Sequence, residues 1–117
     1  MIICDAHCDT LSVIMKRNCG LFRNNCHIDI ERMLRKNDHI QFFAAFTNPS
    51  YGHAYSLNTI LKMFDYFLIE TANNSEYISL CINCNEIENS LKQGKIAALL
   101  SIEGGEILQG ELSTLRM

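Results

Sequence analysis

Two continuous apolar runs constrain the fold of this chain more than any other feature of its sequence. They cover residues 40–47 (IQFFAAFT) and 95–102 (KIAALLSI), and a shorter run, IICDA, covers residues 2–6. Strands that are buried on both faces, as in parallel sheets, have this unbroken pattern, whereas half-exposed strands alternate apolar and polar residues. The three runs therefore predict strands of a parallel sheet.

Helical patterns lie between the runs. Residues 56–74 carry apolar side chains at the spacing of one helix face, which should pack on the core: Leu57, Ile60, Leu61, Phe64 and Leu68. A later helix is predicted from Asn85 and Glu88, which have the spacing of a capping box, and Gly94 should end it.

A shorter helix should begin after Asp29, which would act as its N-cap, and run through Met33 and Leu34. Asn37 can take the left-handed closing position of this helix. Between residues 11 and 27 we expect a loop with one or two helical turns.

The order of these elements is strand, helix, strand, helix, short strand, helix, strand. This order is typical of an α/β protein with parallel strands and right-handed crossovers. Functional residues in such proteins lie at the carboxyl ends of the strands, in open sheets and closed barrels alike. Two segments occupy such ends: HCD at 7–9, and EGGE at 103–106.

The first segment offers two metal ligands. Side chains alternate along a strand, so His7 and Asp9 should point to one side and Cys8 to the other. An imidazole nitrogen and a carboxylate oxygen can hold a divalent ion such as zinc at about 2.0 to 2.2 Å. The same alternation places Asp5 on the His7 face, where its carboxylate could orient a ligand. Glu103 ends an apolar strand, where a carboxylate is costly unless it meets a cation.

Gly104 and Gly105 follow Glu103 and would let the backbone approach a metal or a substrate closely. The tripeptide H-x-D is common by chance, and a single histidine at a strand end is more often structural. The second strand end, with its carboxylate, is what favours a metal site. The other histidines lie in loop-like or helix-flanking sequence and are interpreted as solvated or structural: His27, His39 and His53.

The chain has six cysteines, and its first residues lack the basic and long apolar regions of an export signal, so we expect reduced thiols. Cys81 and Cys84 form a single C-x-x-C, which lacks the second ligand pair of a structural zinc site. We interpret them as two partly buried thiols at a strand end. A redox-active pair is the alternative.

Charge and hydropathy exclude some partners. The net charge is −3 and the ten Lys and Arg residues are scattered, so no basic patch would attract nucleic acid. No apolar run approaches the roughly 20 residues of a membrane helix. We therefore expect a cytoplasmic protein without a nucleic-acid or membrane partner.

Three segments also follow family patterns. Residues 5–11 (DAHCDTL) look like D-G-H-x-D-[TL], and residues 29–46 (DIERMLRKNDHIQFFAAF) look like D-x-x-R-x-x-x-G-x-x-x-Q-F-[FW]-[AS]. The segment GKIAALLSIEGG from residue 94 looks like G-K-I-A-x-[LI]-[IL]-x-[IV]-E-G-G, and L-x-x-L-R comes after it. In these segments, and in their order, the chain resembles the N-terminal part of the membrane (renal) dipeptidase family of zinc metallopeptidases. It departs from the family at Ala6, where a glycine is frequent, and at Asn37 and Asp38, where a glycine turn is expected.

The resemblance implies a (β/α)8 barrel that carries two zinc ions at its carboxyl end and hydrolyses dipeptides through a metal-bridging hydroxide. His7 and Asp9 would ligate one zinc ion, and Glu103 would bridge both. Two histidines from later strands would hold the second ion, another histidine would contact the substrate, and a late aspartate would assist catalysis.

Such a barrel needs roughly 250 residues. Residues 1–117 are therefore expected to form a single partial domain, the first three βα units, truncated after Met117. Its open edge and uncovered apolar faces predict self-association or a homo-oligomer. Alone, the chain should bind at most one zinc ion weakly and should have no catalytic residues beyond the metal ligands.

Two alternatives stay open from the sequence. An amidohydrolase-like enzyme that acts on a non-peptide amide would keep the same barrel and metal site. A non-catalytic α/β fragment would instead use its exposed edge to bind a partner. The preference for substrate side chains and stereochemistry is also left open.

Overall fold

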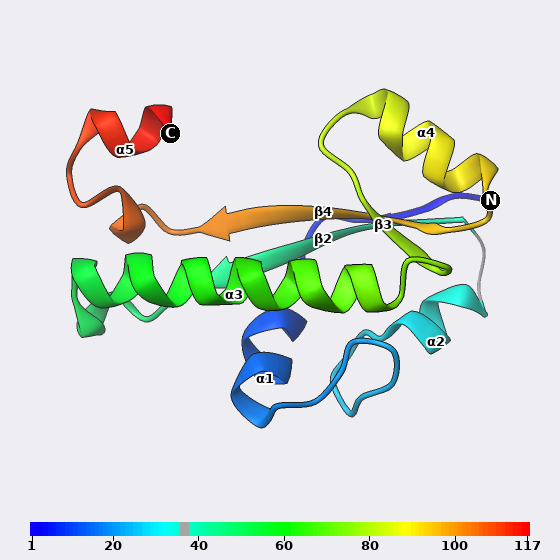
Figure 1. Ribbon diagram of the computed structural model, residues 1–117, viewed down its shortest axis with the longest axis horizontal. Coiled ribbons are helices and arrows are strands. Elements are labelled where there is room, and N and C mark those ends of the chain that lie inside the picture. The colour runs from blue at the N-terminus through cyan, green and yellow to red at the C-terminus, as the bar shows by residue number, and fades with distance from the viewer. Residues whose placement is uncertain (36–37) are drawn as a thin grey trace.

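A four-stranded parallel sheet forms the centre of the computed structural model, which describes residues 1–35 and 38–117 (Figure 1). Its strands lie in the order β1-β2-β4-β3, and every pairing is parallel. Their bounds are β1 Ile3–Asp5, β2 His39–Phe46, β3 Ile78–Leu80 and β4 Ile96–Glu103. The α/β class and the parallel neighbours predicted from the three apolar runs are confirmed.

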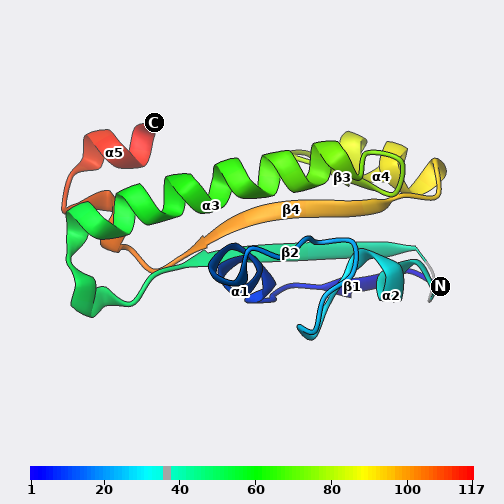
Figure 2. The same cartoon turned by 60° about the horizontal axis from the view of Figure 1, so that its bottom comes forward.

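Helices cover this sheet, with α1 and α2 over its β1–β2 part and α3 running along β4 (Figure 2). Among the described residues, no helix has both the length and the apolar character needed to cross a membrane. The helices, with the 3-10 turns η1 and η2, are α1 Thr10–Arg17, α2 Ile30–Leu34, η1 Pro49–Tyr51, α3 His53–Asn73, α4 Cys84–Lys92, η2 Glu106–Leu108 and α5 Leu112–Arg116.

The core lies between the sheet and the helices. Phe43 of β2 and Phe67 of α3 are both fully buried, and their ring centroids are 4.9 Å apart. The helix α3 turns Ile60, Met63 and Phe67 towards the core. The predicted stripe on this helix was therefore wrong in part. Of its members Ile60 is buried, but Leu61 and Leu68 are 57% and 49% exposed, because apolar residues surround much of this helix and their spacing fits more than one face.

The ends of α2 and α4 show which capping signals are used. Asp29 caps α2 as predicted, since its carboxylate accepts from the Arg32 amide at 2.8 Å. The predicted cap of α4 at Asn85 was wrong: Asn83 accepts from the Glu86 amide at 3.0 Å, and the helix begins two residues earlier. Gly94 follows the last turn with φ +70°, as predicted. Asn37, the predicted end of α2, lies outside the described residues.

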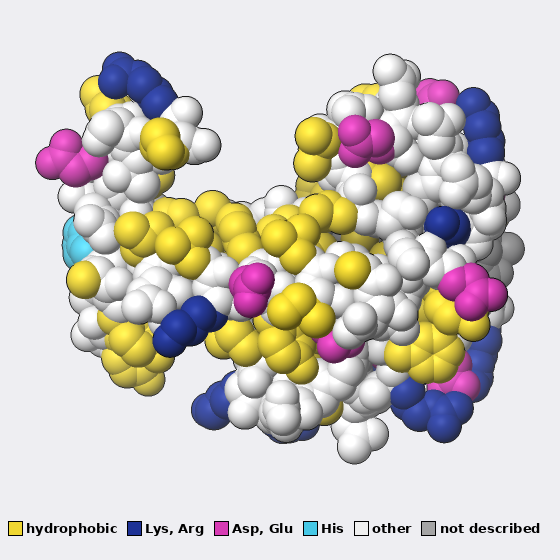
Figure 3. Space-filling view, viewed as in Figure 1, with side chains coloured by type: hydrophobic (Ala, Val, Ile, Leu, Met, Phe, Trp, Pro, Cys, Tyr) yellow, Lys and Arg dark blue, Asp and Glu magenta, His cyan; other side chains and the backbone are white. Residues whose placement is uncertain are grey.

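One edge of β4 is largely open within the described part of the chain. Its first residues, 96–98, pair with β3, whereas residues 99–103 pair only with β2. Hydrophobic side chains gather in the hollow between α4 and α5 beside this edge (Figure 3). Ile102, Leu112 and Leu115 are among the exposed apolar residues of the chain.

Candidate metal centre

A bulge at the end of β1 positions the first candidate ligand. Asp5 pairs with Gln41 in the regular ladder. Cys8 then lies opposite Phe43, because its amide and its carbonyl bond to the residues on either side of Phe43 at 3.1 and 3.0 Å. Three residues thus advance along this segment while two advance along β2, which is the definition of a β-bulge.

The bulge interrupts the alternation expected from the sequence. Asp5 lies opposite Gln41 and Cys8 lies opposite Phe43, and these two residues point to the same face of β2. The regular alternation that would place Asp5 and His7 on one face is therefore broken between them. Asp5 contacts His7 through the main chain instead, because its Oδ1 accepts from the His7 amide at 3.2 Å. Cys8 lies in the core at 7% exposure, as its predicted orientation away from the ligands requires.

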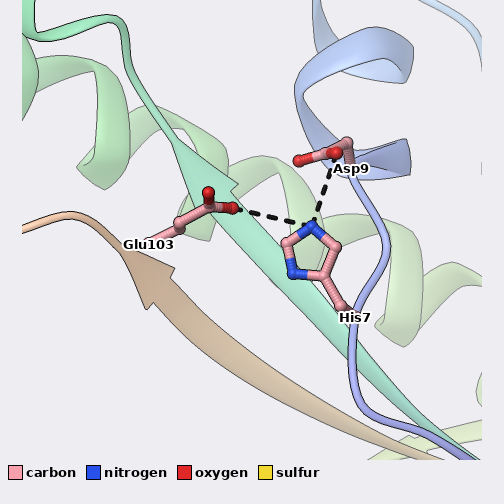
Figure 4. A group of neighbouring side chains, drawn as sticks. All are labelled: His7, Asp9 and Glu103. Atoms are coloured by element: carbon pink, nitrogen blue, oxygen red, sulfur yellow. Dashed lines mark ion pairs between the residues drawn. The ribbon is translucent and has the colours of Figure 1, made fainter.

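His7, Asp9 and Glu103 come together at the carboxyl edge of the sheet (Figure 4). The His7 Nε2 atom lies 3.4 Å from Asp9 Oδ2 and 3.5 Å from Glu103 Oε2. One ligand atom from each of the three residues lies within 4.8 Å of the others. The sequence therefore predicted the grouping of these side chains correctly.

The distances from His7 Nε2 to the two carboxylate oxygens suit ligands of a shared cation better than hydrogen bonds. Hydrogen bonds from nitrogen to oxygen are about 2.7 to 3.2 Å long. Two ligand atoms that each lie about 2.1 Å from a tetrahedral zinc ion are about 3.4 Å apart. The donor set also fits zinc, which accepts imidazole and carboxylate ligands. The three side chains are each at least half exposed, which leaves space for further ligands.

Asp9 departs from the usual behaviour of an aspartate at a helix start. It occupies the N-cap of α1, yet its side chain makes no capping hydrogen bond. At the equivalent position of α2, Asp29 caps the helix. An unused cap gives up about 1 kcal/mol of helix stability. The Asp9 carboxylate faces His7 instead, which is the pattern expected where function overrides local stability.

Cys8 is poorly suited to join these ligands. Burial raises the pKa of its thiol to about 11, and the nearby Asp5 and Asp9 carboxylates raise it further, against hydrogen bonds with Thr10 that lower it. Because metals bind the thiolate, the protonated thiol of Cys8 is a weak ligand at neutral pH.

We expect iodoacetamide to modify Cys8 at least about 100-fold more slowly than the exposed Cys4 at pH 7.5. The raised pKa alone lowers the thiolate fraction by about two powers of ten, and burial adds to this. The Cys8 rate should keep rising with pH until about 11, because the folded chain loses this proton only there. Peptide mapping by mass spectrometry measures both rates, and urea-unfolded chain is the control in which they should converge. Equal rates in the folded chain would contradict the buried thiol.

The two glycines after Glu103 differ in their surroundings. Gly104 has φ +91°, and a Cβ there would collide with the Glu106 carboxylate. The group closest to Gly104 is thus a side chain of this chain, and the approach of its backbone to a metal or substrate stays a prediction. At Gly105 a Cβ would meet no described atom within 4 Å.

A cleft of about 510 Å³ opens beside the candidate metal centre. His7 and Asp9 line one end, and the α1 residues Val13 and Arg17 line a wall. His27, interpreted from the sequence as solvated or structural, is exposed and also lines this cleft. The α1 residues are four apart, so helical spacing after the HCD segment is the signal that could have found that wall.

The remaining predicted residues lie elsewhere. His39 is buried, with Nε2 3.2 Å from Gln41 Oε1, and His53 is exposed at the start of α3. All six cysteines are free. Of the C-x-x-C pair, Cys81 is buried and Cys84 is exposed, so the prediction of two partly buried thiols was wrong.

Comparison with known proteins identifies one family. The family model described as Membrane dipeptidase (Peptidase family M19) matches residues 1–117, the whole chain. No curated protein gives a significant match.

Proposed function

We propose that this chain, which belongs to the membrane dipeptidase family (Peptidase family M19), forms the zinc-binding part of a dipeptidase. The observation that carries this proposal is the position of His7 Nε2 between two carboxylates, 3.4 and 3.5 Å away. The family supports a dipeptidase-type metallohydrolase, and the three side chains supply the ligand types that zinc takes.

Each ligand would have a distinct part. His7 would bind through Nε2, the ring atom that faces both carboxylates, and Asp9 would complete the pair on the same ion. Glu103 lies across the site on β4, where its two oxygens could reach two ions. Zinc, when bound, polarises a substrate carbonyl and makes water more acidic. The half-exposed ligands leave open positions for that substrate.

We also propose that residues 1–117 form the first part of the family's barrel. In this assignment β1, β2 and β4 are the first three barrel strands, and β3 is a short addition that pairs with residues 96–98 of β4. A following strand would then pair with residues 99–103. The exposed apolar side chains beside this edge support self-association when no such strand covers them.

A zinc titration of the 117-residue chain tests the metal centre. We expect one zinc ion per chain, held by nitrogen and oxygen ligands at about 2.0 to 2.2 Å. Competition with a chromophoric chelator gives the stoichiometry, and X-ray absorption gives the ligands. Magnesium is the control, because imidazole favours zinc over magnesium. Sulfur ligation at about 2.3 Å, or no zinc binding at all, would refute the assignment.

A further inference from the structure

A second cleft lies against another face of α1. Its volume is about 430 Å³, and its walls come from α1, the end of β2, the connection after β2 and the start of α3. We propose that this cleft binds an aromatic or large apolar side chain of the dipeptide substrate. The inference rests on the proposed function, which it deepens by naming the substrate class.

Two lining residues of this cleft are direct neighbours of candidate metal ligands. Phe46, which lines it, pairs in register with the candidate ligand Glu103 on the neighbouring strand. Neighbouring strands lie about 4.8 Å apart. Ser12, on the α1 wall, donates its hydroxyl proton to the Asp9 carbonyl at 2.9 Å. In this proposal a substrate bound at the metal ligands would place one side chain in this neighbouring cleft.

The lining suits an apolar ring. Met63 is almost completely buried and Met15 is half-buried, so the cleft has two flexible thioether side chains. Phe46, Tyr51 and Tyr55 add aromatic rings that are 37%, 63% and 52% exposed. The two tyrosine rings meet edge to face with centroids 5.0 Å apart. Methionine adapts to ligand shape and makes favourable contacts with aromatic rings.

The two clefts differ in the charged residues that line them. Among the described lining residues of the second cleft, Lys16 alone is charged, whereas the acidic Asp5 and Asp9 line the first cleft together with Arg17. A carboxylate would therefore meet an ammonium group and no acidic side chain in the second cleft. The second cleft therefore suits the C-terminal residue of the dipeptide, which carries the free carboxylate, and its side chain would lie among the aromatic rings.

The test compares Gly-Phe with Gly-Ala as ligands of the 117-residue chain in EDTA, so that no metal contributes and no hydrolysis occurs. Dissociation constants come from NMR titration. We expect Gly-Phe to bind about fivefold to tenfold more tightly, as one added aromatic contact predicts. Tyr55→Ala should reduce the preference to within twofold, and Tyr55→Phe should keep it.

Leu68→Ala is the matched control, because Leu68 lies on the same helix at 49% exposure and outside this cleft. It should leave the preference unchanged. Tyr51→Ala is the second cleft variant and should also lower it. Equal binding of the two dipeptides by the unchanged chain, or a full preference in both alanine variants of the cleft, would overturn the proposal.

Zinc titration separates this proposal from the proposed function. Tyr55→Ala should bind zinc as the unchanged chain does, since Tyr55 is not a ligand. Zinc binding without a dipeptide preference would overturn the cleft assignment alone. A preference without zinc binding would overturn the metal centre and leave the cleft as an aromatic binding site.

Discussion

The His7→Ala chain is expected to bind zinc at least about 100-fold more weakly than the unchanged chain. His7 supplies the nitrogen of the three-residue cluster, and its Nε2 is the atom that faces both carboxylates. Without it, Asp9 and Glu103 form a pair of half-exposed carboxylates, a donor set that suits magnesium or calcium better than zinc. Loss of a hydrogen-bonding partner of a ligand typically costs 10-fold to 100-fold in affinity, so loss of a ligand should cost at least the upper value.

Competition with a chromophoric chelator at pH 7.5 measures this loss. His27→Ala is the matched control, because His27 is exposed and lines the same cleft but is not a member of the cluster. Its zinc affinity should stay within about twofold of the unchanged chain. If the His7→Ala chain kept its zinc affinity, or the His27→Ala chain lost it, a residue other than His7 would be the zinc ligand.

The sheet could be predicted from the sequence because its strands are buried on both faces. The runs at residues 40–47 and 95–102 have no polar alternation, so they fit parallel strands and few other structures. The grouping of the candidate ligands could be predicted because parallel strands bring their carboxyl ends to one edge. This is why His7 and Glu103, far apart in the sequence, were expected to meet.

Other features depend on contacts that the sequence does not display. The bulge before Cys8 is defined by its hydrogen bonds to β2, and the residue types between Asp5 and Cys8 do not predict it. Two overlapping Asn-x-x-Glu patterns, Asn83 with Glu86 and Asn85 with Glu88, lie at the start of α4, and both fit a capping box. The structure uses the first, Asn83 with Glu86, because β3 ends just before it and the helix starts at once.

The sequence did not predict the two clefts for a related reason. Each joins residues of α1 to a distant segment, such as His27 in one cleft and Tyr55 in the other. Spacing along α1 shows which residues share a face, but it does not show which loop lies opposite. The aromatic residues after β2 could have been noticed in the sequence, but the position of Phe46 beside Glu103 follows only from the strand register.

The 117-residue chain is expected to show no dipeptidase activity above a zinc blank, even with zinc supplied. The described residues group three candidate ligands, and Glu103 would have to serve both ions of a two-metal site. The family resemblance implies that the second ion would depend on histidines from later strands. Without that ion one of the two metals that would activate an attacking water would be missing, and substrate positioning worth several kcal/mol would also be lost.

The comparison is a polypeptide in which this sequence is followed by the later strands of the family's barrel, assayed on the same panel of dipeptides. It should hydrolyse dipeptides, and its His7→Ala and Glu103→Gln variants should lose at least about 1,000-fold in kcat/KM, because each change removes a ligand of the reacting centre. Turnover by the 117-residue chain at a comparable rate would refute the ligand count, since three side chains would then suffice. An inactive longer polypeptide that still binds two zinc ions would instead favour hydrolysis of a non-peptide amide, because the metal centre would be intact and only the substrate assignment would have failed.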